Sequence, residues 1–179
     1  VDHGVPRAFF INKCDDPEAR FKHVFEQLRE TCGISVCPVI IPLLQGDKIV
    51  GLVDLITKTA TSFGKGNVGK PMDIPAESND RIEEFRAMLI ESVAETSDEL
   101  LEKFFAEEEI TQDEVIKAVH TGMRQGTLAP VFCGSATNLC GLEPLMDMIM
   151  DTFPSPLYHK AETVITESGE EKEAPTNEN

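Results

Sequence analysis

Ala8-Phe9-Phe10-Ile11-Asn12-Lys13-Cys14-Asp15-Asp16-Pro17 takes the chain from an apolar run, through a polar loop, to the start of a helix. The apolar run is typical of a short strand, and Pro is favoured in the first helical turn, so we expect a strand over 5–11 and a helix over 17–32 that stops at Gly33. The same order recurs as an apolar run over 128–133 and a helical pattern over 141–153. Strand, helix, strand, helix indicates an α/β fold of parallel strands with crossover helices.

The loop between the first strand and helix has side chains that suit recognition of guanine. Guanine presents N1–H and the N2 amine side by side, and the Asp15 carboxylate can accept from both, whereas adenine lacks this donor pair. Such a bidentate contact to a base edge is worth roughly 1–3 kcal/mol of discrimination. Asn12 can bond base and loop through its amide, and Lys13 can lay its aliphatic stem along the purine. The alternative is a polar loop in which Asp16 caps the helix.

A second motif, Gly134-Ser135-Ala136, follows the later apolar run. In the GTPase fold, a Ser-Ala loop after the next strand closes over guanine: the Ala N–H points at O6, and the Ser hydroxyl braces the Asp carboxylate. The alternative is an ordinary strand–helix turn. Ligands bind at the carboxyl ends of parallel strands. We therefore expect Asn12 and Ser135 to lie at the same edge of the sheet.

The chain resembles translation elongation factor G over nearly its whole length. The resemblance is carried by Gly4-Val5-Pro6-Arg7, Asn12-Lys13-Cys14-Asp15, Arg81-Ile82-Glu83-Glu84-Phe85, Cys133-Gly134-Ser135-Ala136 and Phe153-Pro154-Ser155-Pro156-Leu157. It implies the back half of a P-loop GTPase core, in a protein that couples GTP hydrolysis to ribosomal translocation. It also implies a set of contacts to the guanine of GTP or GDP: Asn12, Lys13, Asp15, Ser135, Ala136 and Thr137. Cys14 stands where this family usually has Met.

The interval between the two motifs is several times longer than the roughly 25 residues that one helix, a connection and a strand require. It has its own strand and helix patterns. We expect a hairpin of 36–44 with 48–56, a strand within 57–63, a loop over 64–79, helices over 80–106 with a break near 96–98, and a helix that a capping box opens at Thr111. We therefore assign residues 1–33 and 128–156 to the GTPase core, 34–127 to an inserted α+β subdomain, and 157–179 to a disordered linker toward the next domain.

The phosphate-binding half of a GTPase is not recognisable in the sequence. A G-x-x-x-x-G-K-[ST] loop cradles the phosphates and places a hydroxyl on Mg²⁺. The nearest stretch, Gly64 to Pro71, has a proline in place of that hydroxyl. We expect a flexible loop there, with Mg²⁺ and the catalytic groups held by a part of a longer parent protein. The chain alone should therefore bind guanine nucleotides at most weakly and should not hydrolyse GTP.

The composition is strongly acidic, with 16 basic and 32 acidic residues and a net charge of −16. This balance opposes direct contact with nucleic acid. The acid is concentrated between Glu77 and Glu114, so we expect contact with the ribosome through protein. The resemblance implies the ribosomal stalk protein as the partner of the insert, and the alternative is a solvated acidic face. No apolar run approaches a membrane span, and five cysteines without C-x-x-C spacing indicate reduced cytoplasmic thiols rather than a metal site.

Two other functions remain open from the sequence. The parent could be a paralogous GTPase with a ribosome-protection or release role. Alternatively, the chain could be an acidic protein-docking module whose GTPase motifs are vestigial.

Overall fold

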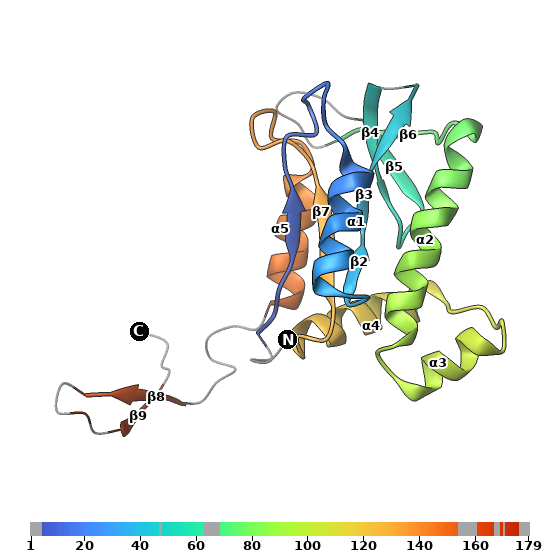
Figure 1. Cartoon of the computed structure of the whole chain (residues 1–179). Helices are drawn as coiled ribbons and strands as arrows, with labels where there is room; N and C mark the ends of the chain where they lie inside the picture. The colour runs from blue at the N-terminus through green and yellow to red at the C-terminus, as the bar shows by residue number, and fades with distance from the viewer. Residues whose placement is uncertain are drawn as a thin grey trace.

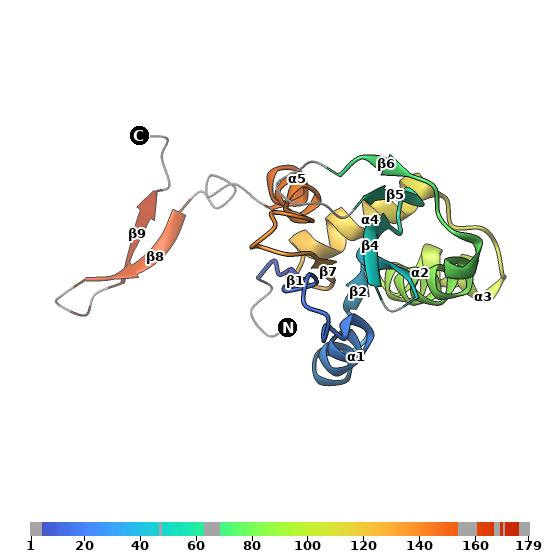
Figure 2. The ribbon, with the colours of Figure 1, turned by 90° about the horizontal axis from the view of Figure 1, so that it is seen from above.

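A three-stranded parallel sheet in the order β1-β7-β2 lies at the centre of the fold (Figure 1). Its strands are β1 (Phe9–Ile11), β7 (Ala129–Cys133) and β2 (Val36–Pro38). This computed structural model describes residues 5–46, 48–62, 69–153, 161–166, 169 and 171–175. The helix α1 (Phe21–Cys32) covers one face of the sheet (Figure 2). The helices α4 (Gln112–Arg124) and α5 (Leu142–Thr152) cover the other face (Figure 2). The expected α/β class is confirmed.

The residues between β2 and β7 form a second sheet and two further helices. The sheet is antiparallel in the order β3-β4-β5-β6, with β3 (Ile40–Gln45), β4 (Lys48–Asp54), β5 (Thr59–Ser62) and β6 (Pro71–Met72). A 3-10 turn, η1 (Ala76–Ser78), leads into α2 (Asn79–Ala94), and α3 (Asp98–Phe105) follows. The expected hairpin and the strand after it are present. The loop expected over 64–79 lies partly outside the described residues, and its described part contains β6 and η1.

The first strand of the expected hairpin is divided between the two sheets. Val36–Pro38 runs parallel to β7, with Val36 opposite Ala129, whereas Ile40–Gln45 pairs with β4. The Val39 N–H, at the junction, donates to the Val131 carbonyl at 2.9 Å. Residues 36–38 therefore belong to the core sheet, although the sequence placed them in the insert. We propose an inserted subdomain that begins at about residue 39.

The first helix begins later than expected. Residues 16–19 form a turn in which the Asp16 carboxylate accepts from the Glu18 N–H at 2.8 Å, and the Ala19 N–H donates to the Asp16 carbonyl at 2.9 Å. The helix starts only at Phe21, with Arg20 as its N-cap residue. Asp16 thus closes a turn rather than capping the helix. The expected stop at Gly33 is confirmed, at φ +85°.

Two helix starts in the insert follow the expected side-chain capping. The Ser97 hydroxyl accepts from the Leu100 N–H at the break between α2 and α3. At α4, the Thr111 hydroxyl accepts from the Glu114 N–H, and the Glu114 carboxylate accepts from the Thr111 N–H at 2.9 Å. These local bonds pair helix N–H groups that have no partner inside the helix, so they fix where α3 and α4 begin.

The described part of the tail contains secondary structure where we expected a disordered linker. The strands β8 (Ala161–Ile165) and β9 (Glu171–Pro175) pair antiparallel. The turn between them includes Gly169 at φ +81°, whose N–H donates to the Thr166 carbonyl at 2.8 Å. β-branched residues near this turn favour a strand locally, even though the segment is polar and acidic as a whole.

The insert and the core are joined by a cluster of aromatic side chains. Phe85 of α2 lies edge-to-face against Phe21 and Phe25 of α1, with ring centroids 5.6 and 5.5 Å apart. Phe25 and Phe85 are fully buried, and one hydrophobic cluster includes residues of both sheets. The helix that follows the Asn12–Asp15 loop is therefore packed directly against the insert.

Candidate functional site

The Asn12–Asp15 loop leaves the carboxyl end of β1 and is fastened to the neighbouring strand by Cys14. The Cys14 N–H donates to the Gly134 carbonyl at 2.9 Å, and the Cys14 thiol is 3.5 Å from the Ile11 carbonyl. Lys13 has a φ of +64°, so the chain turns sharply here. Cys14 is 3% exposed, whereas Asn12, Lys13 and Asp15 are exposed. The loop thus presents three polar side chains to solvent from a buried anchor.

The second loop lies beside the first, at the same edge of the sheet. Ile11 is opposite Cys133 in the parallel pairing of β1 and β7, so both loops begin at the same level. The Asn12 Oδ1 accepts from the Ala136 N–H at 2.9 Å, which joins two residues that are 124 positions apart. Ala136 and Thr137 are exposed. The structure therefore brings the two sequence motifs together into one surface.

Ser135 is buried and organises the second loop from within. Its backbone exchanges hydrogen bonds with Cys140 at 2.9 and 3.0 Å, and its hydroxyl accepts from the Asn138 N–H at 3.1 Å. A Cβ on Gly134 would lie 2.1 Å from the Cys140 carbonyl oxygen, so only glycine fits there. The Ser135 and Ala136 contacts differ from those expected with guanine: the hydroxyl bonds Asn138, and the Ala136 N–H bonds Asn12.

Two cysteines lie beneath these loops. A hydrogen bond with the Cys133 thiol lowers the pKa of the Cys14 thiol, while burial raises the pKa of Cys133 well above its ordinary value. No role for Cys14 was predicted from the sequence. The sequence does hold a sign that Cys14 is buried. It is the least polar residue of the loop and stands among three polar ones, and a free cysteine behaves as a small hydrophobic residue that tends to face inward.

A cavity of about 1460 Å³ opens beside the first loop, between the core and the insert. Its walls come from the first loop and the turn over 16–20, from the first part of α1, from β3 and β4, from the start of α2, and from Asn138 of the second loop. They include Cys14, Asp15, Phe21, Lys22, Pro42, Lys48 and Arg81. The Arg81 guanidinium lies 5.7 Å from the centre of the Phe85 ring. Its Nε is buried and has no hydrogen-bond partner among the described residues, and burial lowers its pKa. Arg81 belongs to a stretch that carries the resemblance, but the sequence predicted no role for it at the site.

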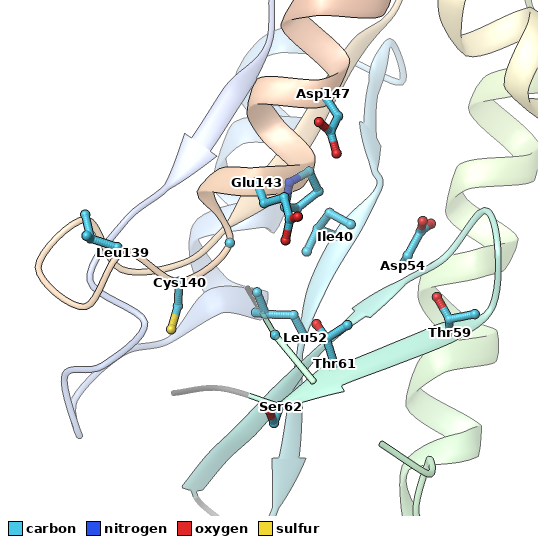
Figure 3. A pocket seen from close by; sticks show the side chains of 13 residues that line it. Ile40, Leu52, Asp54, Thr59, Thr61, Ser62, Leu139, Cys140, Glu143 and Asp147 are labelled. Carbon is cyan, nitrogen blue, oxygen red and sulfur yellow. The ribbon is translucent and has the colours of Figure 1, made fainter. Parts of the chain in front are cut away.

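A smaller cavity of about 370 Å³ lies on the other side of the second loop. Glu143 and Asp147 reach it from α5, and Asp54 and Thr61 reach it from the second sheet (Figure 3). None of the six site residues taken from the sequence lines it. Of the six, Asp15 lines the larger cavity, and the other five line neither.

The exposed side chains of this surface offer hydrogen-bond donors and acceptors. Asp15 offers a carboxylate, and Asn12 offers its amide donors while its oxygen is bonded to Ala136. The described residues contain no group of three or more His, Cys, Asp or Glu side chains that could hold a metal ion.

Within the same part of the chain, no helix combines the length and apolar character needed to cross a membrane.

Comparison with known proteins agrees with this arrangement. The family model of the Elongation factor Tu GTP binding domain matches residues 1–155. A crystal structure of a protein from Thermus thermophilus has 33% sequence identity and a TM-score of 0.74, over 88% of this chain and 23% of that one. This chain thus spans about a quarter of the length of that protein.

The match over residues 1–155 shows that the chain belongs to the family of Elongation factor Tu GTP binding domains, which is a family of translational GTPases. Membership implies binding of a guanine nucleotide.

Proposed function

We propose that this chain is the guanine-recognition half of a translational GTPase resembling elongation factor G, together with its inserted subdomain. The parent protein couples GTP binding and hydrolysis to ribosomal translocation. The observation that carries the proposal is the hydrogen bond from the Ala136 N–H to Asn12 Oδ1, which couples both sequence motifs at the carboxyl edge of a parallel sheet. Ligands bind at that edge in α/β folds.

Five of the six site residues have a distinct role in the proposed complex. The Asp15 carboxylate accepts from N1–H and the N2 amine of guanine, the Lys13 stem covers the purine face, and the Asn12 amide holds the two loops together. When the base binds, the Ala136 N–H is shared between Asn12 Oδ1, which it bonds in this structure, and O6 of guanine. Ser135 shapes the loop from its buried position, and the exposed Thr137 lies next to Ala136.

The phosphates and Mg²⁺ of GTP are held, in this proposal, by groups of the parent protein other than these residues. A phosphate loop requires glycines, a lysine and a hydroxyl in fixed order. The stretch from Gly64 to Pro71 lacks that hydroxyl, and residues 63–68 lie outside the described ranges. The chain by itself should therefore bind GDP or GTP weakly and should not hydrolyse GTP.

The proposed setting is the cytoplasmic ribosome. A net charge of −16 disfavours direct contact with RNA, so the insert approaches the ribosome through protein, with the ribosomal stalk protein as the partner. A paralogous ribosome-protection or release role uses the same guanine site. The acidic character of the insert favours a second candidate, a docking module that no longer reads guanine.

Substitution of Asp15 by Asn tests the base assignment. Xanthine has a carbonyl where guanine has the N2 amine, so the asparagine amide donates to it while its oxygen accepts from N1–H. Asp15→Asn in the parent protein should lower the affinity for GDP by roughly 1–3 kcal/mol and raise the affinity for xanthosine diphosphate. The two affinities are measured by isothermal titration calorimetry.

The matched control is Asp16→Asn, because Asp16 is the exposed neighbouring aspartate and bonds only its own turn, through the Glu18 N–H. It should leave the preference for guanine unchanged. Retention of full guanine preference by Asp15→Asn would contradict the site assignment and favour the docking module. In the 179-residue chain, sub-micromolar Mg²⁺-dependent GTP binding would overturn the division of the site between this chain and the rest of the parent.

A further inference from the structure

The antiparallel sheet of the insert turns one face toward α5. Successive residues of a strand alternate between the two faces of a sheet, so Leu52 and Asp54 of β4 lie on the same face. Residues paired directly across a ladder share a face, which adds Thr61, Thr59 and Ile40 to it. The cavity of about 370 Å³ lies between this face and α5, and its volume is in the range of small-molecule sites.

The floor of this cavity is apolar. Ile40 is 4% exposed and Leu52 is 6% exposed, and Pro144 of α5 lines the cavity as well. Figure 3 shows the Ile40 and Leu52 side chains on the side of the cavity that faces α5. Methylene groups of a ligand gain free energy when they leave water for such a floor, whereas a hydrated inorganic ion does not.

Three carboxylates stand around this floor. Glu143 and Asp147 are both exposed and are four positions apart on α5, a spacing that places like charges side by side and destabilises a helix. None of the salt bridges among the described residues includes either of them. Asp54 is half-buried, with Oδ1 accepting from the Ile56 and Thr57 N–H groups. Among the described residues that line the cavity, none is Lys, Arg or His, so a positively charged ligand would balance these carboxylates.

The placement of the carboxylates selects the kind of cation. Asp54, Glu143 and Asp147 do not form a group that could hold one metal ion, since the described residues contain no such group. Two of them reach the cavity from α5 and the third from the sheet, on the other side of the apolar floor (Figure 3). A fitting ligand therefore carries separate positive charges joined by an apolar chain. Aliphatic polyamines have this chemistry, because methylene runs connect their ammonium groups.

We propose that this cavity binds an aliphatic polyamine. One ammonium group pairs with Glu143 and Asp147, and a second pairs with Asp54. The methylene chain between them lies on Ile40 and Leu52, as the stem of a lysine lies on apolar surface while its charged head stays in water. The site does not depend on the guanine assignment, because none of the six residues proposed for guanine lines this cavity.

The test is isothermal titration calorimetry of the whole 179-residue chain with spermidine. The double variant Glu143→Gln, Asp147→Asn keeps the shape of both side chains and removes their charge. It should raise Kd about tenfold, because each accessible charge pair contributes a few-fold. The matched control is Glu102→Gln, Asp113→Asn, which makes the same change at two exposed residues that do not line the cavity. Its Kd should change less than about twofold.

A ligand series tests the chemical class. Putrescine has two ammonium groups on a four-carbon chain, and butylamine has the same chain with one. Putrescine should bind several-fold more tightly than butylamine, because only the diamine reaches carboxylates on both sides of the floor. Mg²⁺ has the charge of putrescine without its methylene groups, so an equal concentration of Mg²⁺ should not displace putrescine.

Amide NMR spectra locate the ligand. Saturation with spermidine should shift the amide resonances of Thr61 and Gly141, which line the cavity from the sheet and from the second loop. Circular dichroism melts show that each variant is folded.

Four results would overturn the proposal. Absence of spermidine binding by the wild type would remove the site altogether. An equal rise in Kd in both double variants would mean diffuse attraction to an acidic chain. Displacement of putrescine by an equal concentration of Mg²⁺ would mean a site for divalent cations. Unchanged amide resonances at Thr61 and Gly141 would place the ligand elsewhere.

Discussion

Replacement of Phe85 by Ala tests whether the insert and the GTPase core fold as one unit. Phe85 is fully buried, and it contacts Phe21 and Phe25 from the opposite helix at centroid distances of 5.6 and 5.5 Å. Truncation of a buried Phe to Ala costs about 3–5 kcal/mol, which includes the loss of both aromatic pairs at about 0.5–1.5 kcal/mol each. Because a domain is stable by only about 5–15 kcal/mol, we expect a large loss of the free energy of unfolding.

Urea unfolding monitored by far-ultraviolet circular dichroism measures this loss by linear extrapolation. The wild type and the variant should each unfold in a single transition, because the aromatic cluster joins α2 of the insert to α1 of the core. The control, Phe105→Ala, makes the same chemical change at a residue that is 76% exposed, and it should cost less than about 0.5 kcal/mol.

Two results would refute this reasoning. A cost below about 1 kcal/mol for Phe85→Ala would mean that the cluster collapses around the missing ring without consequence, against the range for buried aromatics. Separate transitions for core and insert in the wild type would mean that α1 and α2 pack without cooperativity. A double-mutant cycle of Phe21→Leu and Phe85→Leu should give a coupling energy of about 0.5–1.5 kcal/mol.

Two further predictions concern ionisable groups. The Lys103 ammonium, with the bonds from Thr111, lowers the pKa of Glu114 to about 2. The ionised Glu114 carboxylate therefore stabilises the fold at pH values above its unfolded pKa of about 4.3, and this stabilisation is lost as the pH falls toward 2. The melting temperature of the wild type should therefore approach that of Glu114→Gln as the pH falls between these two values. A difference in melting temperature that does not change with pH would contradict the ion pair. Cys32 is the exposed cysteine, whereas the other four are buried and burial raises the pKa of Cys37 to about 12. A thiol reagent such as dithionitrobenzoate should modify one cysteine rapidly in the native chain and all five only after unfolding, and rapid native labelling of a second thiol would contradict this burial.

Local chemistry explains what could be predicted from the sequence. The capping box at Thr111 and Glu114 and the stop at Gly33 depend on residues within one helical turn, so their pattern is visible in the sequence and the structure confirms both. The apolar run over 128–133 likewise predicts a strand, and the structure has the buried β7 at Ala129–Cys133. The Asn12–Asp15 loop was recognisable because its chemistry is concentrated in adjacent side chains.

Long-range pairing explains what could not be predicted. Two neighbouring segments, Val36–Pro38 and Ile40–Gln45, are similarly rich in apolar and β-branched residues. They belong to different sheets because the first pairs with β7 and the second with β4. The helix expected from residue 17 begins only at Phe21, after a turn in which the Asp16 carboxylate accepts from the Glu18 N–H.

The sequence by itself determined the α/β class and predicted the side chains that we propose to read guanine, because strand and helix periodicity and side-chain chemistry are local properties. Only the tertiary structure decided that Ala136 donates to Asn12, that Cys14 anchors the loop, and that the insert is packed on α1 through Phe85. Each of these depends on how distant backbone and side-chain groups satisfy one another in a shared core. Sequence spacing does not specify such partners, since every segment offers similar donors, acceptors and apolar surface until the chain folds.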